Sequence, residues 1–180
     1  MLLHSRGQKG DRQATDINAV LEEYLNISYH GMMAKDATFN IALERAYDSS
    51  VGDVEVVPQD LSRVFLNILN NACYAVSEKR KQLGNGAPYE PTLSVRTLNL
   101  GGRIEVRIRD NGTGIPPEVR EKIFHPFFTT KPTGHGTGLG LSISHDIIVQ
   151  EHGGELEVET EPGKFTEFII RLPREKRPAA

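Results

Sequence analysis

Two glycine-rich segments of this 180-residue chain contain the residue types best suited to chemistry. The first is DNGTGIP, from Asp110 to Pro116, and the second is GTGLGLS, from Gly136 to Ser142. Glycine lets the backbone come close to a ligand, and the free N–H groups at the start of a helix favour anions. Because the second segment also opens a helical pattern, the pair predicts a mobile loop beside an anion-binding site.

Asp110 ends a run of residues, 103–110, in which isoleucine and valine alternate with arginine and glutamate. Counting in steps of two along a strand places the Asp110 carboxylate on the apolar face. A buried carboxylate without a hydrogen-bond donor is costly. Either the strand ends earlier than its pattern indicates, or Asp110 is reserved for a ligand that carries N–H groups. The glycines that follow favour the ligand.

A second polar pair lies on the longest helical pattern of the chain. Asn67 and Asn71 are four residues apart, on the side of this helix away from its apolar stripe. Asparagine oxygens suit a hard cation such as Mg2+ that already carries phosphate oxygens and water. In isolation such a pair is more often two exposed amides. Together with Asp110 and the glycine segments, it favours a metal–nucleotide site.

The elements that position these residues follow from the spacing of the apolar side chains. We expect one helix from Asp16, its N-cap, to Gly31 or shortly after, and the long helix from Pro58 to about residues 83–86. A third helix is expected from near Gly138 to residues 153–154. Strands are expected at 39–47, 54–57, 92–100, 103–110, 155–160 and 165–173, with the first two forming a hairpin.

This order of elements predicts an α+β fold, a two-layer sandwich with one mixed, mostly antiparallel sheet and helices on one face. A lid-like segment is expected from Ile115 to about His135. The net charge of −3 gives no attraction to nucleic acid, and a single cysteine excludes an internal disulfide. No signal peptide and no membrane-spanning apolar run is present, so a cytoplasmic location is expected.

Four segments resemble, in order, the N, G1, F and G2 boxes of the ATP-binding catalytic domain of two-component sensor histidine kinases. They are LNILNNACYAV, DNGTGIP, FHPFFTTK and GTGLGLSIS. These kinases are part of the Bergerat-fold, or GHKL, ATPases, which include gyrase-type, Hsp90-type and MutL-type proteins. The resemblance spans about Asp16 to Pro173 and implies the Bergerat fold with a mobile ATP lid. It divides the chain into 1–14, a poorly packed remnant of an upstream dimerisation helix and linker, 15–175, the catalytic domain, and 176–180, a tail.

The resemblance implies a role for each matching residue. Asp110 would accept a hydrogen bond from the adenine amino group, and Thr166 would hold a water near the base. Asn71 would bind Mg2+, with Asn67 supporting it or sharing the ion. The remaining ATP-binding residues would be Gly112, Gly114 and Ile115 near the base, and Gly136, Thr137, Gly138, Leu139 and Gly140 at the phosphates.

Two features of the lid keep alternatives open. Lys131 could reach a phosphate, or it could be a solvated loop lysine. The aromatic cluster of Phe124, Phe127 and Phe128 could anchor the lid, dock against a partner helix that bears the phosphoacceptor, or do both. None of the six histidines has the spacing of a metal ligand or the context of a phosphoacceptor; His135, in the lid, is the one worth testing.

Asn67 stands where hydrolysing relatives have a glutamate that activates water, so slow free hydrolysis is expected. The resemblance implies that the chain binds Mg-ATP and donates the γ-phosphoryl group to a histidine on a dimerisation domain of the same protein. That histidine and its acidic neighbour are expected upstream, in a homodimeric parent that could be membrane-anchored, with a response regulator as an indirect partner. The fragment itself would be monomeric. The alternatives are a nucleotide-binding-only module, and an ATPase or serine kinase of the same superfamily.

Overall fold

The computed structural model describes residues 10–132, 136 and 138–175. Helices and strands alternate irregularly along this part of the chain, and two short turns, η1 and η2, interrupt them. In chain order the elements are β1 (Gln13–Asp16), α1 (Ile17–Lys35), β2 (Ala42–Ala46), η1 (Ser49–Val51), β3 (Asp53–Val56), α2 (Pro58–Leu83), β4 (Thr92–Asn99), β5 (Arg103–Asp110), α3 (Pro117–Arg120), α4 (Gly140–His145), η2 (Asp146–Glu151), β6 (Glu155–Glu161) and β7 (Phe165–Pro173).

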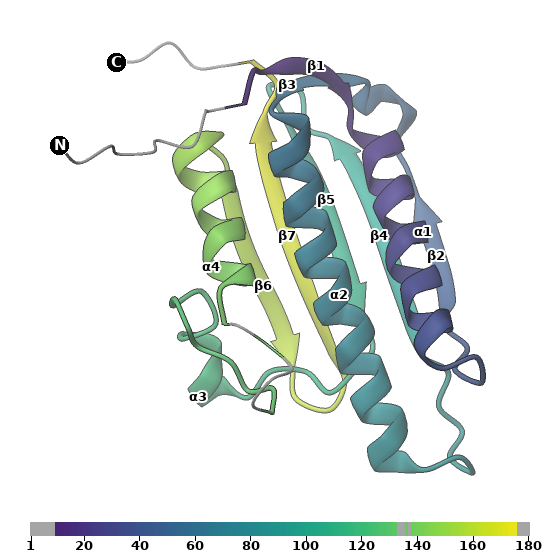
Figure 1. Ribbon diagram of the computed structural model, residues 1–180. Helices are drawn as coiled ribbons and strands as arrows, with labels where there is room; N and C mark the ends of the chain where they lie inside the picture. The colour runs from purple at the N-terminus through teal and green to yellow at the C-terminus, as the bar shows by residue number, and fades with distance from the viewer. Residues whose placement is uncertain (1–9, 133–135, 137, 176–180) are drawn as a thin grey trace, which may run out of the picture.

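The main sheet has five strands in the order β2-β4-β5-β7-β6. Only β2 runs parallel to its neighbour, and the other pairs are antiparallel. The helices α1, α2 and α4 all lie on one face of this sheet (Figure 1). The structure therefore confirms the predicted two-layer α+β sandwich with a mixed, mostly antiparallel sheet.

Helix α2 forms the centre of the interface between the two layers. It starts with Pro58 in its first turn and ends at Leu83 with Gly84 as its C-cap, as the sequence predicted. The side chains that recur along one side of α2 are all 4% exposed or less, namely Leu61, Val64, Phe65, Ile68, Leu69, Ala72 and Val76. Burial of this stripe fixes the rotation of the helix, and so turns its polar side toward the lid.

The predicted hairpin between residues 39–47 and 54–57 is wrong. Strand β2 pairs with β4, while β3 pairs with β1 in a separate two-stranded sheet. The turn η1 between them is tied to the end of β4, because Asp48 N–H donates to Thr97 Oγ1 at 3.0 Å and Asp48 Oδ2 accepts from Asn99 N–H at 3.0 Å. These bonds hold the segment after β2 at the end of β4, so the chain does not fold back along β2 as a hairpin.

The packed part of the chain begins before the expected boundary at residue 15. Gln13 and Ala14 pair with residues of β3, and the Arg12 guanidinium donates to the carbonyl oxygens of Glu55 and Glu151. Residues 10–14 therefore form contacts with the domain, although a poorly packed remnant was expected there. Most of that expected remnant, residues 1–9, and the expected tail at 176–180 lie outside the described residues.

Helix α1 begins where predicted, since the Asp16 carboxylate accepts from Ala19 N–H at 3.1 Å. It runs through Gly31 to Lys35, because Gly31 keeps an ordinary negative φ and does not serve as a C-cap. The third helix starts at Gly140 and continues as the π-helical turn η2, which the sequence did not predict. It ends before Gly153, whose φ of +64° suits a glycine.

A buried histidine ties the end of η2 to the start of α2. His152 is 3% exposed. Its Nε2 accepts from Val57 N–H at 3.1 Å, so its Nδ1 carries the proton and donates to Ile147 O at 2.8 Å. Helix α2 is thereby joined to the helix formed by α4 and η2 at the end opposite the lid.

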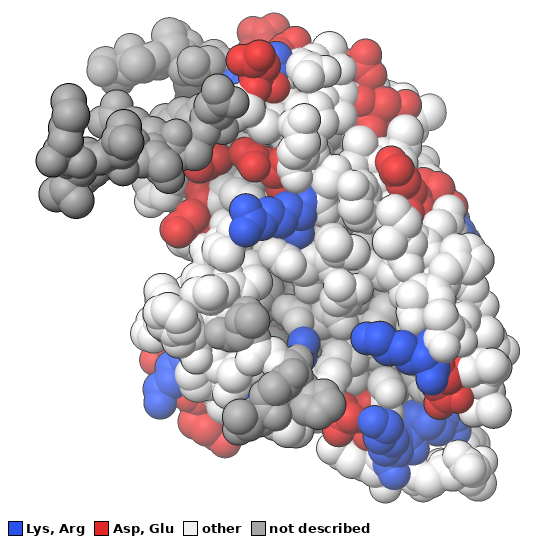
Figure 2. Space-filling view, viewed as in Figure 1, with Lys and Arg blue, Asp and Glu red and all other residues white. Residues whose placement is uncertain are grey.

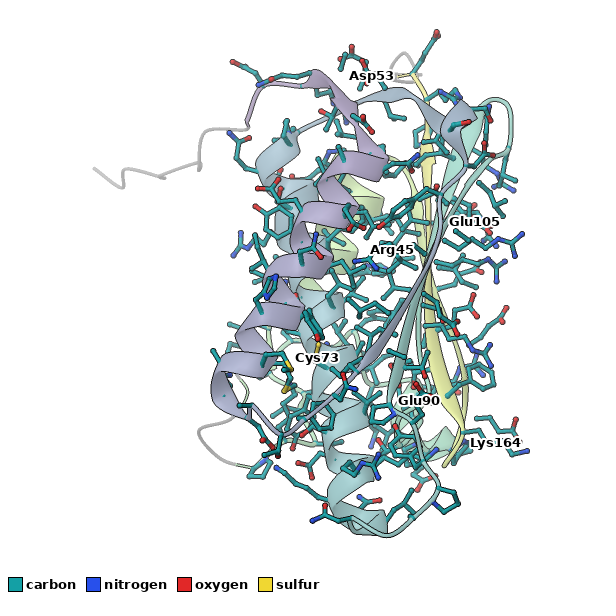
Figure 3. All side chains as sticks on the ribbon, turned by 90° about the vertical axis from the view of Figure 1, so that its right-hand side faces the viewer. Arg45, Asp53, Cys73, Glu90, Glu105 and Lys164 are labelled. Carbon is teal, nitrogen blue, oxygen red and sulfur yellow. The ribbon has the colours of Figure 1, made fainter. Side chains whose placement is uncertain are left out.

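The other face of the main sheet is covered by charged side chains (Figure 3). Glu105, labelled there, is 4% exposed because Arg107 and Arg171 enclose it, with nitrogen–oxygen distances of 2.5 and 2.9 Å. Burial alone would raise the pKa of Glu105, but these hydrogen bonds hold it below its usual range. Among the described residues, no helix has the length and apolarity needed to cross a bilayer.

Candidate functional site

A cavity of about 370 Å³ opens between α2, the lid segment and the ends of β5 and β7. The same face of the molecule is hollowed beside the lid segment in Figure 2. Ten of the residues predicted from the sequence line this cavity: Asn67, Asn71, Asp110, Gly114, Ile115, Lys131, Gly136, Gly138, Gly140 and Thr166. The structure therefore brings together both glycine segments, the asparagine pair and the carboxylate.

Asp110 lies on the inner face of β5, as the alternation predicted, and is 3% exposed. Its Oδ1 accepts from Gly112 N–H at 2.9 Å. Burial raises the pKa of Asp110 to about 7, against the opposing effects of the Gly112 N–H and the charges of Arg109 and Lys79. Within the described part of the chain, no protein group donates a hydrogen bond to Oδ2. The cavity wall thus presents an acceptor oxygen that is available to a hydrogen-bond donor of a ligand.

The asparagine pair stands on the α2 wall of the cavity. Asn67 donates through Nδ2 to Gly140 O at 3.2 Å and to Ser144 Oγ at 3.3 Å, which leaves its Oδ1 for other contacts. Asn71 Oδ1 accepts from the Lys131 ammonium at 3.1 Å. Both amides are therefore oriented by α4 and the lid, not left as free surface side chains.

Lys131 packs against α2 instead of extending into solvent. Its Nζ lies 4.7 Å from the centre of the Tyr74 ring. Burial, together with the charge of Lys35, lowers the pKa of Lys131. Of the two interpretations of this lysine, the solvated loop residue is wrong. A positive charge already lies at Asn71 Oδ1, where the resemblance implies a metal ion.

The donor set at this wall fits a cation that arrives with its own ligands. Neutral amide oxygens bind Mg2+ weakly by themselves, and Mg2+ commonly takes most of its ligands from phosphates and water. Among the described residues, no group of three or more histidine, cysteine or acidic side chains could hold a metal ion. The chemistry of Asn71 and Asn67 therefore suits a metal–phosphate complex better than a free ion.

Several of the glycines maintain close contacts within the protein. A Cβ on Gly138, whose φ is +70°, would come within 2.3 Å of the Phe127 carbonyl carbon. Gly114, with a φ of +68°, would meet Glu161 O at 2.3 Å. These two glycines let the lid pack against the helix start and against the turn between β6 and β7.

Two of the predicted residues that the structure describes, Gly112 and Leu139, do not line the cavity. Gly112 instead approaches α2, where an added Cβ would lie 2.6 Å from the Ala75 carbonyl carbon. Leu139 is the residue before α4, and Thr137 lies outside the described residues, as does His135. Alternation and glycine spacing alone could not distinguish an approach to a ligand from an approach to a helix.

The phenylalanine cluster divides between two environments. Phe124 packs edge-on against Phe168 with ring centres 6.4 Å apart, and Phe128 lines the cavity. Phe127 is 75% exposed and has a φ of 66°, a conformation uncommon outside glycine. Phe124 and Phe128 therefore anchor the lid, whereas Phe127 is left facing solvent.

Sequence reasoning missed the groups that hold the loop after β5. Lys79 donates to Asn111 O at 3.1 Å and to Gly163 O at 2.8 Å. Asn111 Oδ1 accepts from Thr92 N–H at 2.8 Å, and its Nδ2 donates to Glu90 O at 2.8 Å. An asparagine after a strand is a signal for such a turn, but nothing in the helical pattern of α2 marks Lys79.

Comparison with known families places this arrangement. Residues 56–176 match the family described as histidine kinase-, DNA gyrase B-, and HSP90-like ATPases. This chain belongs to that family. Membership of this ATPase family implies that the chain binds ATP.

Curated relatives identify the branch of the family. The sensory histidine kinase/phosphatase NtrB of Vibrio alginolyticus is 37% identical over 139 residues, 74% of this chain and 37% of that protein. NtrB of Escherichia coli O157:H7 is 33% identical over 93% of this chain and 45% of that protein. The sensor histidine kinase ZraS of Escherichia coli K12 is 30% identical over 89% and 31%. The chain thus spans less than half the length of these relatives.

Solved structures agree. The catalytic domain of histidine kinase ThkA, in a nucleotide-free form, matches with a TM-score of 0.72 and 29% identity, covering 91% of this chain and 96% of that one. The mycobacterial sensor histidine kinase MprB matches with a TM-score of 0.64 and 28% identity, over 90% and 97%. The chain therefore carries the catalytic ATP-binding domain of sensor histidine kinases, which confirms the resemblance found in the four boxes.

Proposed function

We propose that this domain binds Mg-ATP in the cavity and donates the γ-phosphoryl group to a histidine on a dimerisation domain of the same protein, within two-component signalling. The observation that carries the proposal is the buried Asp110 carboxylate, which faces the cavity with one oxygen that no described group satisfies. A hydrogen-bond acceptor at such a place suits the amino group of adenine.

The opposite wall suits the phosphates. Asn71 and Asn67 would hold the Mg2+ that accompanies ATP, and that ion would neutralise charge on the phosphate oxygens. Lys131 would leave Asn71 Oδ1, 3.1 Å away here, and turn its ammonium to a phosphate oxygen. The backbone N–H groups of Gly136, Gly138 and Gly140, which line the cavity, would add further donors.

In the reaction, the bond from the γ-phosphorus to its bridging oxygen breaks as a nitrogen–phosphorus bond forms on the acceptor histidine. Phosphoryl transfer depends mainly on alignment and on neutralising charge. The residues of this chain bind the nucleotide, orient it and exclude water through the lid. The nucleophile and its proton acceptor come from the dimerisation domain, and a response regulator would receive the phosphoryl group afterwards.

A kinase is favoured over a self-sufficient ATPase by the residue at position 67. An asparagine amide cannot take a proton from water near neutral pH, so Asn67 cannot serve as a general base. The names of the relatives NtrB and ZraS, which describe histidine kinases, support the same choice. The second candidate, a module that binds nucleotide without transferring phosphate, stays open until transfer is measured.

The test combines binding with transfer. We expect the purified chain to bind Mg-ATP, to phosphorylate a separately supplied histidine-bearing dimerisation domain, and to hydrolyse ATP slowly. Asp110→Asn should weaken binding at least tenfold, because the amide replaces an acceptor with a donor. The matched control is Asp53→Asn, because Asp53 is an exposed residue of β3 at the end of the molecule far from the lid (Figure 3). This variant should bind as the unchanged protein does.

Three outcomes would contradict the proposal in different ways. An absence of binding, or identical binding by Asp110→Asn, would refute the assignment of the cavity. Binding without any transfer would favour the binding-only module. Rapid steady-state hydrolysis that is abolished by changing Asn67 would favour the ATPase or serine-kinase alternative.

A further inference from the structure

A row of three polar residues crosses the sheet at the end that borders the cavity. Strands β5, β7 and β6 are neighbours (Figure 1), and their register places Asp110 opposite Thr166 and Thr166 opposite Thr160. Asp110 and Thr166 line the cavity and are 3% and 4% exposed, whereas Thr160 lies behind Thr166 and does not line it. Thr160 could therefore influence a ligand only through its neighbours.

The hydrogen bonds of the Thr160 hydroxyl group use its single hydrogen and its acceptor oxygen. Thr160 Oγ1 accepts from Ile115 N–H at 2.9 Å and donates its single hydrogen to Phe165 O at 2.8 Å, since a carbonyl can only accept. Thr166 Oγ1 lies 3.1 Å from the same oxygen. Because Thr160 has no second hydrogen, Thr166 is the donor of this bond. The lone pairs of Thr166 remain for the cavity.

We infer that Thr160 is a positioning residue that fixes the Thr166 hydroxyl as an acceptor, and thereby selects a ligand whose amino group carries two N–H donors. Asp110 Oδ2 supplies the second acceptor on the neighbouring strand. Two acceptors side by side match the two hydrogens of an exocyclic amine, directly or through one water. Without Thr160, the Thr166 hydrogen would be free to turn toward Asp110 and would occupy the carboxylate.

The inference rests on the proposed function, in which the adenine amine lies at this end of the cavity. It adds a source of base specificity outside the binding residues themselves. A 6-oxo purine would direct a carbonyl oxygen at two acceptors, and a purine without a 6-substituent would leave both unused. The contribution of Thr160 should therefore appear in the ratio of affinities for nucleotides that differ only at this position.

The experiment is a calorimetric titration with two probes, Mg-ATP and the Mg complex of purine riboside triphosphate, which lacks the 6-amino group. Thr160→Val removes the hydroxyl while keeping the branched side chain that suits a strand. We expect this variant to bind ATP about three- to tenfold more weakly, which is the range of one neutral hydrogen bond. Its affinity for purine riboside triphosphate should change less than about twofold. Thr160→Ser should restore the preference for ATP.

A double-mutant cycle tests whether Thr160 acts through Thr166. Thr166→Val alone should lose a similar part of the preference for ATP over purine riboside triphosphate. The double variant should lose no more of this preference than Thr166→Val does. The matched control is Thr97→Val, because Thr97 Oγ1 also accepts a backbone N–H, from Asp48 at 3.0 Å, and donates to Asn18 Oδ1 at 2.8 Å. That variant should lose stability and keep the same preference.

Thermal unfolding of each variant verifies its folding, and Thr160→Ala replaces Thr160→Val if the valine variant does not fold. Equal weakening of both nucleotides by Thr160→Val, or no change in either, would overturn the inference, since a purely structural residue would behave in one of these ways. An unchanged protein that bound neither probe would overturn the proposed function as well. The two failures are thus distinguished by the titration of the unchanged chain.

Discussion

At the scale of single residues, folding places a carboxylate on the cavity wall with one oxygen that no described group satisfies. Asp110 lies on the inner face of the sheet, and burial raises its pKa to about 7 from the usual 3.8. Arg109 and Lys79 act against this shift without cancelling it. Between pH 3.8 and about 7, the domain without nucleotide therefore holds a proton on Asp110 that the unfolded chain would release, and this difference links its stability and its binding to pH.

The first prediction concerns stability. The folded pKa of Asp110 is raised, so its contribution is fully present below pH 3.8 and disappears as the pH rises through about 7. The free energy of unfolding of the unchanged protein should therefore fall across this window relative to that of Asp110→Asn. Urea unfolding of both proteins at several pH values measures the difference. Parallel pH profiles for the two proteins would contradict the raised pKa.

The second prediction is the opposite trend in binding. Mg-ATP affinity should increase as the pH rises through about 7, because the ionised carboxylate accepts hydrogen bonds from the adenine amine better than the acid does. Asp110→Asn should remove this pH dependence, while Asp53→Asn should keep it. Nucleotide titrations in matched buffers measure the trend, and an affinity that is independent of pH in the unchanged protein would be evidence against it.

At the scale of elements, the periodicity of the apolar residues was sufficient to predict a helix or strand wherever one of its faces packs against the core. The stripe of α2 and the alternation in β5 were enough to predict on which faces Asn67, Asn71 and Asp110 lie. Contacts between distant segments were not accessible in this way. The pairing of β3 with β1 and the link from Lys131 to Asn71 depend on partners far away in the chain. Local spacing contains no information about such partners.

Replacing His152 should uncouple the end of η2 from the start of α2. His152→Ala leaves Val57 N–H without its acceptor in a buried setting, while Ile147 O keeps only the backbone N–H of residue 152 as its donor. We expect a loss of about 2 kcal/mol in the free energy of unfolding, within the usual cost of an unsatisfied buried group. The control, His30→Ala on an exposed position of α1, should change it by less than about 0.5 kcal/mol. Equal effects in urea unfolding would refute the link.

The contact between the lid and the start of α4 should require a glycine. Gly138→Ala would place a Cβ at a positive φ, against the Phe127 backbone, so the lid would have to move. ATP affinity should fall several-fold as a result. Gly31→Ala, in open space on α1, should instead raise stability by about 0.5–1 kcal/mol with unchanged affinity. Unaltered binding by Gly138→Ala would contradict this view of the lid.

At the scale of the whole molecule, the two faces of the sheet have different tasks. One face packs the helices and opens into the cavity, and the other is covered by ion pairs around Arg171 and Glu105. The large exposed hydrophobic residues among those described are Ile27, Leu83, Leu100 and Phe127, which lie on separate elements. The described surface therefore offers no broad apolar patch for self-association.

The isolated domain should accordingly be a monomer. Sedimentation at micromolar concentration should give one species with the mass of a single 20.0 kDa chain.

Phe127→Ser, which changes the 75% exposed aromatic residue of the lid, should leave this mass unchanged and weaken phosphorylation of the dimerisation domain in trans, if that residue docks there. A stable dimer of the unchanged domain would contradict the monomer, and transfer at full rate by the variant would remove Phe127 from the docking surface.

The central claim is that the cavity holds Mg-ATP with its base on Asp110 and its metal at Asn71. A crystal structure of the chain with Mg2+ and a non-hydrolysable ATP analogue tests this claim most directly. The account predicts the adenine amino group within hydrogen-bond distance of Asp110 Oδ2, Mg2+ bound to the Asn71 side-chain oxygen, and Lys131 released from Asn71. A nucleotide bound elsewhere, or bound here with its base turned away from Asp110, would contradict it.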